Sequence, residues 1–223
     1  MEITPIAYIK NDYHEKFGIP RQSGLIEEVE SRIVFEKEFA QPEALRGLED
    51  YDYIWLIFEF SKNHKRPFSA TVKPPRLGGH ERMGVFATRS PFRPNNLGLS
   101  SVKLLRIEGT DLIVAGADLL DGTPIYDIKP YVTFADAHPD AKAGFVDERD
   151  WKEIQVEFSD ELLSYIDENK REAVLKVLSQ DPRPAYDRGV QRDYKLLYGN
   201  WDITFEIRDE KIIVTNVRGV GEN

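Results

Sequence analysis

The sequence contains no cysteine, and that absence excludes several kinds of site. A chain of 223 residues without thiols forms neither a disulfide nor a thiolate metal centre, and it fits a reducing compartment. Histidine is also scarce. The four histidines are scattered without the spacing of metal ligands, so we expect no metal in the mechanism: His14, His64, His80 and His138.

Long apolar runs and targeting signals are missing as well. No stretch approaches the roughly 18 consecutive apolar residues of a membrane span, and Met1 to Pro5 lack the basic-then-apolar pattern of a secretory signal. These features predict a soluble, cytoplasmic protein that does not engage a membrane. The sequence also lacks a Walker loop, a serine nucleophile elbow and the G-x-G-x-x-G turn of a Rossmann cofactor site.

Positive charge is in the minority, with a formal net charge of −9. General coating of nucleic acid needs a basic excess, so that function is not expected. The positive residues nevertheless gather in one region, as Lys62, His64, Lys65, Arg66, Lys73, Arg76, Arg82, Arg89 and Arg93. This cluster indicates either a local basic face or an ordinary solvated loop.

The residues that are present predict a mostly β fold with a smaller α+β unit. Up to residue 133 the pattern predicts short strands separated by Gly/Pro turns, with one short helix over Gln41 to Leu48; such an order is typical of a barrel or sandwich. Tyr51 to Phe60 predicts a strand covered on both faces. A polar linker follows, and then Ser159 begins a helical apolar pattern that continues to Ser179. We expect a β domain over residues 1–136, a linker over 137–150 and an α+β domain over 151–223.

One stretch, Arg82 to Ser100, stands out for its chemistry. It opens as a strand over Met83 to Thr88 and then meets two prolines, each of which biases the residue before it away from helix. Asn95, Asn96 and Gly98 can turn the chain back. The result is a stiff loop with two guanidiniums and an asparagine, which is either a binding loop or a plain Pro-rich connection.

Gly84-Val85-Phe86-Ala87-Thr88-Arg89-Ser90, followed by Arg93-Pro94-Asn95 and Gly98, resembles the signature of the TsaA/TrmO family. Five further segments match in order, around Pro20 to Gly24, Leu45 to Leu48, Pro74 to Gly79, Asp121 to Tyr131 and Asp181 to Tyr186. The resemblance implies an N-terminal β-barrel that binds S-adenosylmethionine, a homodimer, and a C-terminal domain that helps engage tRNA. The implied activity is N6-methylation of N6-threonylcarbamoyladenosine next to the anticodon. Two departures are Asn96, where proline is expected, and a longer basic insert from Lys62 to Phe68.

The resemblance also implies a cofactor site made of separate loops. Its residues are Gln22, Ser23, Gly24, Phe60, Ser61, Arg89, Leu99, Asp118, Leu119, Leu120, Asp121, Gly122 and Thr123. We expect the backbone amides of Gly24 and Gly122 to bind the methionine carboxylate. Asp118 or Asp121 is expected to accept hydrogen bonds from the amino group or the ribose.

The acceptor nitrogen belongs to a urea-like group whose lone pair is delocalised, so a nearby base would help its methylation. Asp121 is the candidate base, although an Asp-Gly turn explains it equally well, and Arg89 is the second expected catalytic residue. Arg89 and Arg93, with Asn95, are expected to hold the threonyl carboxylate or a phosphate. Asp181, Arg183 and Tyr186 either meet the anticodon stem-loop or brace the two domains.

Two rival functions remain open at this point. One is a non-catalytic RNA-binding β-barrel, which would bind tRNA without cofactor. The other is a methyltransferase that acts on a different substrate and uses its C-terminal unit only for dimerisation.

Overall fold

Six antiparallel strands close into a barrel in the computed structural model, which describes residues 2–63, 68–74, 77, 81–147, 153–183, 187 and 192–221. Their order around the barrel is β1 (Ala7–Lys10), β2 (Glu30–Phe35), β7 (Asp111–Ala115), β6 (Leu97–Glu108), β3 (Tyr53–Glu59) and β8 (Pro124–Pro130). The mostly β fold predicted from the sequence is confirmed, and of its two alternatives the structure has the barrel.

Strand alternation fills the barrel interior. Ile54, Leu56 and Phe58 of β3 point inward and are at most 3% exposed, and they pack with residues such as Ile9 and Ile125. The intervening side chains of β3 remain partly exposed on the outer face. The prediction that this strand is covered on both faces is therefore wrong, because a barrel buries only one face of each strand.

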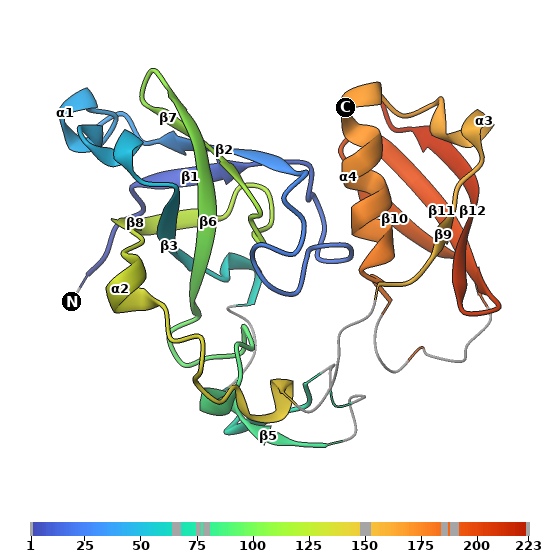
Figure 1. Ribbon diagram of the computed structural model, residues 1–223, viewed down its shortest axis with the longest axis horizontal. Helices are drawn as coiled ribbons and strands as arrows, with labels where there is room; N and C mark the ends of the chain where they lie inside the picture. The colour runs from blue at the N-terminus through green and yellow to red at the C-terminus, as the bar shows by residue number, and fades with distance from the viewer. Residues whose placement is uncertain are drawn as a thin grey trace.

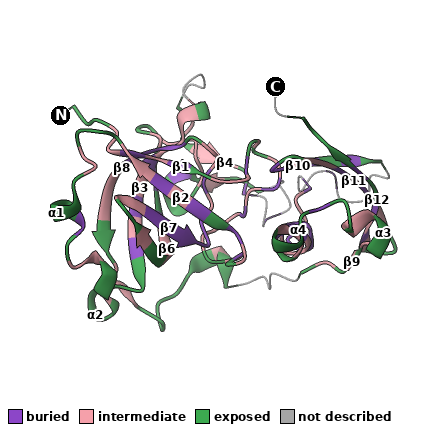
Figure 2. Cartoon of the chain, turned by 90° about the horizontal axis from the view of Figure 1, so that it is seen from above, coloured by how far each residue is buried: buried purple, intermediate pink, exposed green. Residues whose placement is uncertain are grey.

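Short elements connect the strands. They comprise α1 (Pro42–Leu45), η1 (Leu48–Asp50), η2 (Ser61–Asn63), η4 (Val85–Ala87), α2 (Thr133–Asp136) and η5 (Gly144–Val146), with a small hairpin of β4 (Thr71–Val72) and β5 (Met83–Gly84). The hairpin projects below the barrel in Figure 1. Helices α1 and α2 lie on the exposed surface of the barrel in Figure 2. The strand predicted over Met83 to Thr88 stops at Gly84, since the chain then turns through η4.

The C-terminal unit is a separate four-stranded sheet with helices beside it (Figure 1). The sheet order is β10 (Tyr194–Tyr198), β11 (Trp201–Arg208), β12 (Lys211–Gly219) and β9 (Val156–Glu157), the last pair parallel. The predicted helix is two helices, α3 (Asp160–Leu163) and α4 (Glu168–Ser179). Ser159 caps the first, because its Oγ accepts a hydrogen bond from the Leu162 amide at 3.3 Å.

The long loop between β1 and β2 packs into the core of this C-terminal unit rather than into the barrel. Tyr13, Ile26 and Val29 are at most 2% exposed and belong to the same apolar cluster as Val177 and Phe205. Backbone bonds reinforce the contact, with the Gly199 amide donating to the Asp12 carbonyl at 3.0 Å. Residues 11–29 therefore fasten the two units together.

No helix in the described ranges is both long and apolar enough to cross a membrane.

Candidate active site

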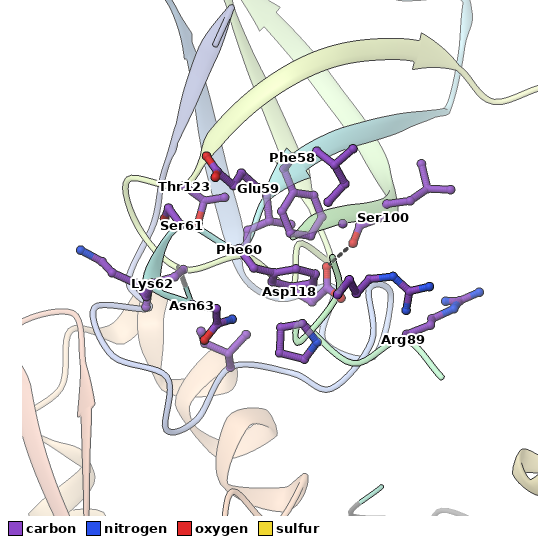
Figure 3. A pocket seen from close by; sticks show the side chains of 18 of the residues that line it. Phe58, Glu59, Phe60, Ser61, Lys62, Asn63, Arg89, Ser100, Asp118 and Thr123 are labelled. Atoms are coloured by element: carbon purple, nitrogen blue, oxygen red, sulfur yellow. Dashed lines mark hydrogen bonds between the residues drawn. The ribbon is translucent and has the colours of Figure 1, made fainter. Parts of the chain in front are cut away.

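A cavity of about 690 Å³ opens at one rim of the barrel (Figure 3). Four segments line it: the loop from Lys16 to Gln22, the end of β3 with η2, the stretch from Thr88 to Ser100, and the loop from Asp118 to Thr123. Pockets of this size are typical of small-molecule and cofactor sites. The barrel closure is what brings these distant segments to one place.

Phe58 and Phe60 form the aromatic wall of the cavity. Their rings meet edge to face, with centroids 5.2 Å apart and planes at 74°. Gly98 of β6 lies directly against Phe58: a Cβ built on Gly98 would stand 2.3 Å from the ring Cζ. A side chain at this position would force the Phe58 ring to move, so packing favours glycine here.

Asp118 supplies a carboxylate to the cavity. The Ser100 hydroxyl donates to Asp118 Oδ1 at 2.5 Å, shown as a dashed line in Figure 3. Burial raises the pKa of Asp118 above its ordinary value, while the Ser100 hydrogen bond and the nearby Arg89 guanidinium act in the opposite direction. A carboxylate in this setting is suited to accept hydrogen bonds from an ammonium or from hydroxyl groups.

Arg89 is exposed and reaches across the cavity edge to the loop after β1. Its Nη1 donates to Gln22 Oε1 at 2.6 Å. The neighbouring Arg21 ties the same loop to the C-terminal unit, since its Nη2 donates to the carbonyls of Asp181 and Arg183 at 3.5 and 3.3 Å. The signature loop, the Gln22 loop and the C-terminal unit are therefore joined at this edge.

Arg93 braces the signature loop from within. Its Nη1 donates to the carbonyls of Val85 and Thr88 at 3.2 and 2.7 Å. Asn96 has a φ of 49°, a left-handed conformation that asparagine tolerates and proline cannot adopt. The departure from the expected proline thus has a local conformational reason.

Ten of the predicted residues line the cavity: Gln22, Phe60, Ser61, Arg89, Arg93, Leu99, Asp118, Leu119, Leu120 and Thr123. The remaining predicted residues that the structure describes do not line the cavity: Ser23, Gly24, Asn95, Asp121, Gly122, Asp181 and Arg183. Tyr186 lies outside the described residues, as do His64 to Pro67 of the basic insert.

Two predicted roles are corrected by the hydrogen bonds. The Gly24 amide donates to the Gly116 carbonyl at 2.9 Å, and the Gly122 amide donates to the Ile9 carbonyl at 2.8 Å. Both amides are used inside the protein, so they do not form the expected carboxylate site. Asp121 is likewise a turn residue: its Oδ1 accepts from the Asn11 amide at 3.1 Å, and it stands outside the cavity lining.

Arg183 is 8% exposed, and Asp181 holds it through two hydrogen bonds, from Nε at 2.7 Å and from Nη2 at 2.9 Å. Asp181 itself has a φ of 49°. These contacts are those of a structural brace next to Arg21, which was one of the two alternatives left open by the sequence.

Sequence reasoning missed several lining residues, including Arg21, Trp55, Phe58, Glu59 and Ser100. Ser100 carried a signal: strand alternation places it on the inner face, where a buried serine, 3% exposed here, needs a polar partner. Glu59 gave none. Its Oε2 accepts from the Tyr126 hydroxyl at 2.6 Å, and the pKa of Tyr126 is raised to about 12 by burial and by this carboxylate.

The cavity mouth is basic although the chain is acidic. Lys16, Arg21, Lys62, Arg89 and Arg93 line it, against the carboxylates of Glu59 and Asp118 among the described lining residues. Within the described part of the chain, no three His, Asp or Glu side chains are grouped so as to hold a metal ion.

A closed β-barrel with a cavity at its rim, joined to a C-terminal α+β unit, defines a class of two-unit proteins. Two family descriptions match the chain: the tRNA-methyltransferase O N-terminal domain over residues 8–137 and the TrmO C-terminal domain over residues 151–220. The chain belongs to the tRNA-methyltransferase O family.

Individual relatives agree with this assignment. The chain is 38% identical over 220 residues to a tRNA (adenine(37)-N6)-methyltransferase of Escherichia coli, covering 93% of this chain and 94% of the relative. It is 42% identical over 193 residues to a putative S-adenosylmethionine-dependent methyltransferase of Pseudomonas aeruginosa, covering 83% of each. The crystal structure of TrmO from Pseudomonas aeruginosa superposes with a TM-score of 0.81 at 36% identity, over 98% of both chains.

Proposed function

We propose that this protein methylates N6 of adenosine 37 in tRNA, that its substrate base carries the threonylcarbamoyl group, and that the rim cavity is its active site. The observation that carries the proposal is the gathering of Gln22, Phe60, Arg89 and Asp118 around one cavity of about 690 Å³. Family membership supplies the coarser statement: the chain is an S-adenosylmethionine-dependent tRNA (adenine-N6)-methyltransferase.

The cavity fits the chemistry of S-adenosylmethionine. The edge-to-face pair of Phe58 and Phe60 offers an apolar surface for the adenine ring. Asp118 accepts hydrogen bonds from the ammonium group or the ribose, and Arg89 is placed to pair with the carboxylate of the methionine portion. When bound there, the cofactor supplies an electrophilic methyl group on a sulfonium.

The protein's own task is to orient the acceptor and to take its proton. Methyl transfer is an in-line displacement, so the side chains must hold the acceptor nitrogen close to the methyl carbon and in line with the bond that breaks. The acceptor nitrogen must also lose its proton when the methyl group is transferred. Because Asp121 stands outside the cavity, we assign the base role to Glu59, the lining carboxylate that accepts from Tyr126.

Arg89 and Arg93 face the same mouth, and Asn95 is exposed at the tip of their loop. We assign the threonyl carboxylate or an adjacent phosphate to Arg93 and Asn95, since Arg89 is assigned to the methionine carboxylate. We assign Tyr186, on the basis of the family resemblance, to contact with the anticodon stem-loop. For Asp181 and Arg183, the paired and buried arrangement favours the brace that positions the C-terminal unit.

The proposal includes a homodimer in the cytoplasm. Leu97 and Leu99, which line the cavity, are 37% and 55% exposed, and we assign their exposed surface to the contact with a second copy at the cavity rim. Sedimentation of the purified protein tests this part, since a monomer at micromolar concentration contradicts it.

The first experiment is calorimetric titration of the purified protein with S-adenosylmethionine, followed by transfer of labelled methyl groups to tRNA with and without threonylcarbamoyladenosine. Saturable binding and transfer to the modified tRNA support the proposal. Binding of tRNA without cofactor affinity would favour a non-catalytic RNA-binding barrel instead. Transfer to an unmodified tRNA would retain the methyltransferase and remove the substrate assignment.

A further inference from the structure

One aromatic side chain on the signature loop, Phe86, is largely exposed to solvent. Phe86 is 72% exposed, although it is the middle residue of η4 and its neighbour Val85 is 1% exposed. The turn itself is fixed, because the Val85 amide donates to the Ala70 carbonyl at 2.9 Å. Burial of Val85 explains the turn, and the Arg93 guanidinium beside the Phe86 ring leaves most of that ring open to solvent.

The ring is presented by a braced backbone. Arg93 donates to the carbonyls on both sides of Phe86, those of Val85 and Thr88, and its Cζ lies 5.7 Å from the Phe86 ring centroid. The Thr88 hydroxyl also donates to the Val85 carbonyl at 2.9 Å. A ligand that stacks on this ring would therefore meet a turn that is already ordered, which lowers the entropic cost of binding.

The surroundings of Phe86 are basic, in contrast to the chain as a whole. Between residues 81 and 100 the sequence has three arginines and one acid, Glu81, against a net charge of −9 for the protein. Arg82 and Lys73 are exposed on the adjoining β4–β5 hairpin, and Phe68, shortly before β4 in the sequence, is 58% exposed. An aromatic ring among exposed cations is the combination that binds single-stranded nucleic acid, through stacking and phosphate pairing.

The same charges disfavour a second copy of the chain as the occupant. A two-fold contact centred on Phe86 would bring each patch against its own copy and set Arg82 and Arg89 against like charges. An RNA strand instead offers phosphates to the arginines and an unpaired base to the ring.

We propose that Phe86 is a stacking platform for an unpaired base of the RNA substrate, one or two nucleotides from the adenosine that enters the cavity. This inference rests on the proposed function. The distance fits, because Phe86 precedes the cavity residue Arg89 by three positions, which span at most about 10 Å. Arg82 and Lys73 pair with the phosphates on either side of the stacked base. The platform holds the strand in register while the target base is turned into the cavity.

The test compares Phe86→Ala, Phe86→Leu and Phe86→Trp in the full-length protein with an anticodon stem-loop RNA that carries 2-aminopurine beside the target adenosine. Loss of base stacking predicts about a 5- to 150-fold weaker RNA affinity for the Ala variant. The Trp variant keeps an aromatic ring, so it should retain RNA binding and quench the 2-aminopurine fluorescence. The Leu variant is apolar but not aromatic, so it should bind RNA as weakly as the Ala variant. Phe134→Ala is the matched control, since Phe134 of α2 is 91% exposed and lies outside the cavity lining.

Cofactor titration keeps the outcomes distinct. We expect the S-adenosylmethionine dissociation constant of each Phe86 variant to stay within about twofold of wild type, which also verifies that the variants are folded. Unchanged RNA affinity of Phe86→Ala overturns the platform while leaving the methyltransferase intact. A change in oligomeric state without a change in RNA affinity would show that the ring meets a second copy, and also overturns it. Failure of the wild-type protein to methylate tRNA would instead refute the proposed function.

Discussion

Gly98 gives the sharpest test of how the cavity is built. A Cβ at this position would lie 2.3, 2.5 and 2.8 Å from three atoms at the far end of the Phe58 ring. Real Cβ contacts are not that short, so in Gly98→Ala the ring must move. Phe58 lines the cavity, and the cavity is the open space beside it. We therefore expect the ring to turn into the cofactor site.

The magnitude follows from two opposing terms. Overpacking a filled core costs about 1–3 kcal/mol, while replacing glycine lowers the entropy of the unfolded chain and returns about 0.4–1 kcal/mol. The net loss of stability is about 1–2 kcal/mol, or a fall in melting temperature of about 2–8 °C for a chain of this size. Cofactor affinity should fall by at least about tenfold, because the adenine surface is displaced.

Gly84→Ala is the matched control within the same signature. Gly84 has φ −56° and ψ 135°, and a Cβ there meets nothing within 4 Å. Its stability should be unchanged or slightly higher, with normal cofactor binding. The measurements are thermal unfolding and calorimetric titration with S-adenosylmethionine. Adding Phe58→Leu to Gly98→Ala should recover stability but not affinity, a coupling that contacting residues show. If Gly98→Ala matches Gly84→Ala in both assays, the reasoning from the close contact is refuted.

Three further predictions concern polar groups and one concerns the C-terminal unit. Arg89→Ala should weaken cofactor binding by about 10- to 100-fold in titration with little change in unfolding temperature; unchanged affinity would remove Arg89 from the cofactor site. Glu59→Gln should lower kcat at least about 100-fold with cofactor affinity retained; a fully active variant excludes Glu59 as the base. For Asp118, the folded-state pKa lies above the unfolded value, so the ionised form is the destabilised one. The resulting decrease in the free energy of unfolding begins as the pH rises above about 3.9, and it is complete above the folded-state pKa of Asp118. Asp118→Asn should therefore unfold at a higher temperature than wild type at pH 7 and at the same temperature at the acid end, while binding cofactor more weakly; equal stability at both pH values contradicts the assignment. Removal of residues 151–223 should leave an aggregation-prone barrel, because it exposes Tyr13, Ile26 and Val29; a monodisperse, cofactor-binding fragment would show that these residues do not need the second unit.

Local patterns were sufficient where local forces decide the structure. The strand predicted over Tyr51 to Phe60 is present as β3, the helix predicted over Gln41 to Leu48 contains α1, and Ser159 caps its helix as expected. The strand predicted beyond Gly84 failed for a non-local reason. Arg93, eight residues after Val85, donates to the Val85 carbonyl and stabilises a turn, and no periodicity in Met83 to Thr88 reports that bond.

The sequence predicted which segments form the candidate site, but not which atoms of those segments are available to a ligand. The resemblance identified the loops that meet at the barrel rim, yet it assigned the Gly24 and Gly122 amides to a ligand when both bond to backbone carbonyls of neighbouring segments. Glu59 and Phe58 were invisible as site residues, because within a strand they look like ordinary sheet positions. Only the closure of β3 against β6 and β8 decides which end of that strand borders an open space.

The two units are divided differently by sequence and by packing, and this bears on how the site works. Residues 11–29 lie within the barrel match, but their apolar side chains belong to the core of the C-terminal unit. The same loop carries Gln22, which receives Arg89, and Arg21, which reaches the Asp181 turn. One wall of the cavity is consequently held in place by the unit that the family resemblance associates with tRNA. Because this loop packs into the C-terminal core and is hydrogen-bonded to the barrel through the Gly24 amide and the Gly116 carbonyl, we expect a shift of the C-terminal unit to displace the Arg89–Gln22 contact.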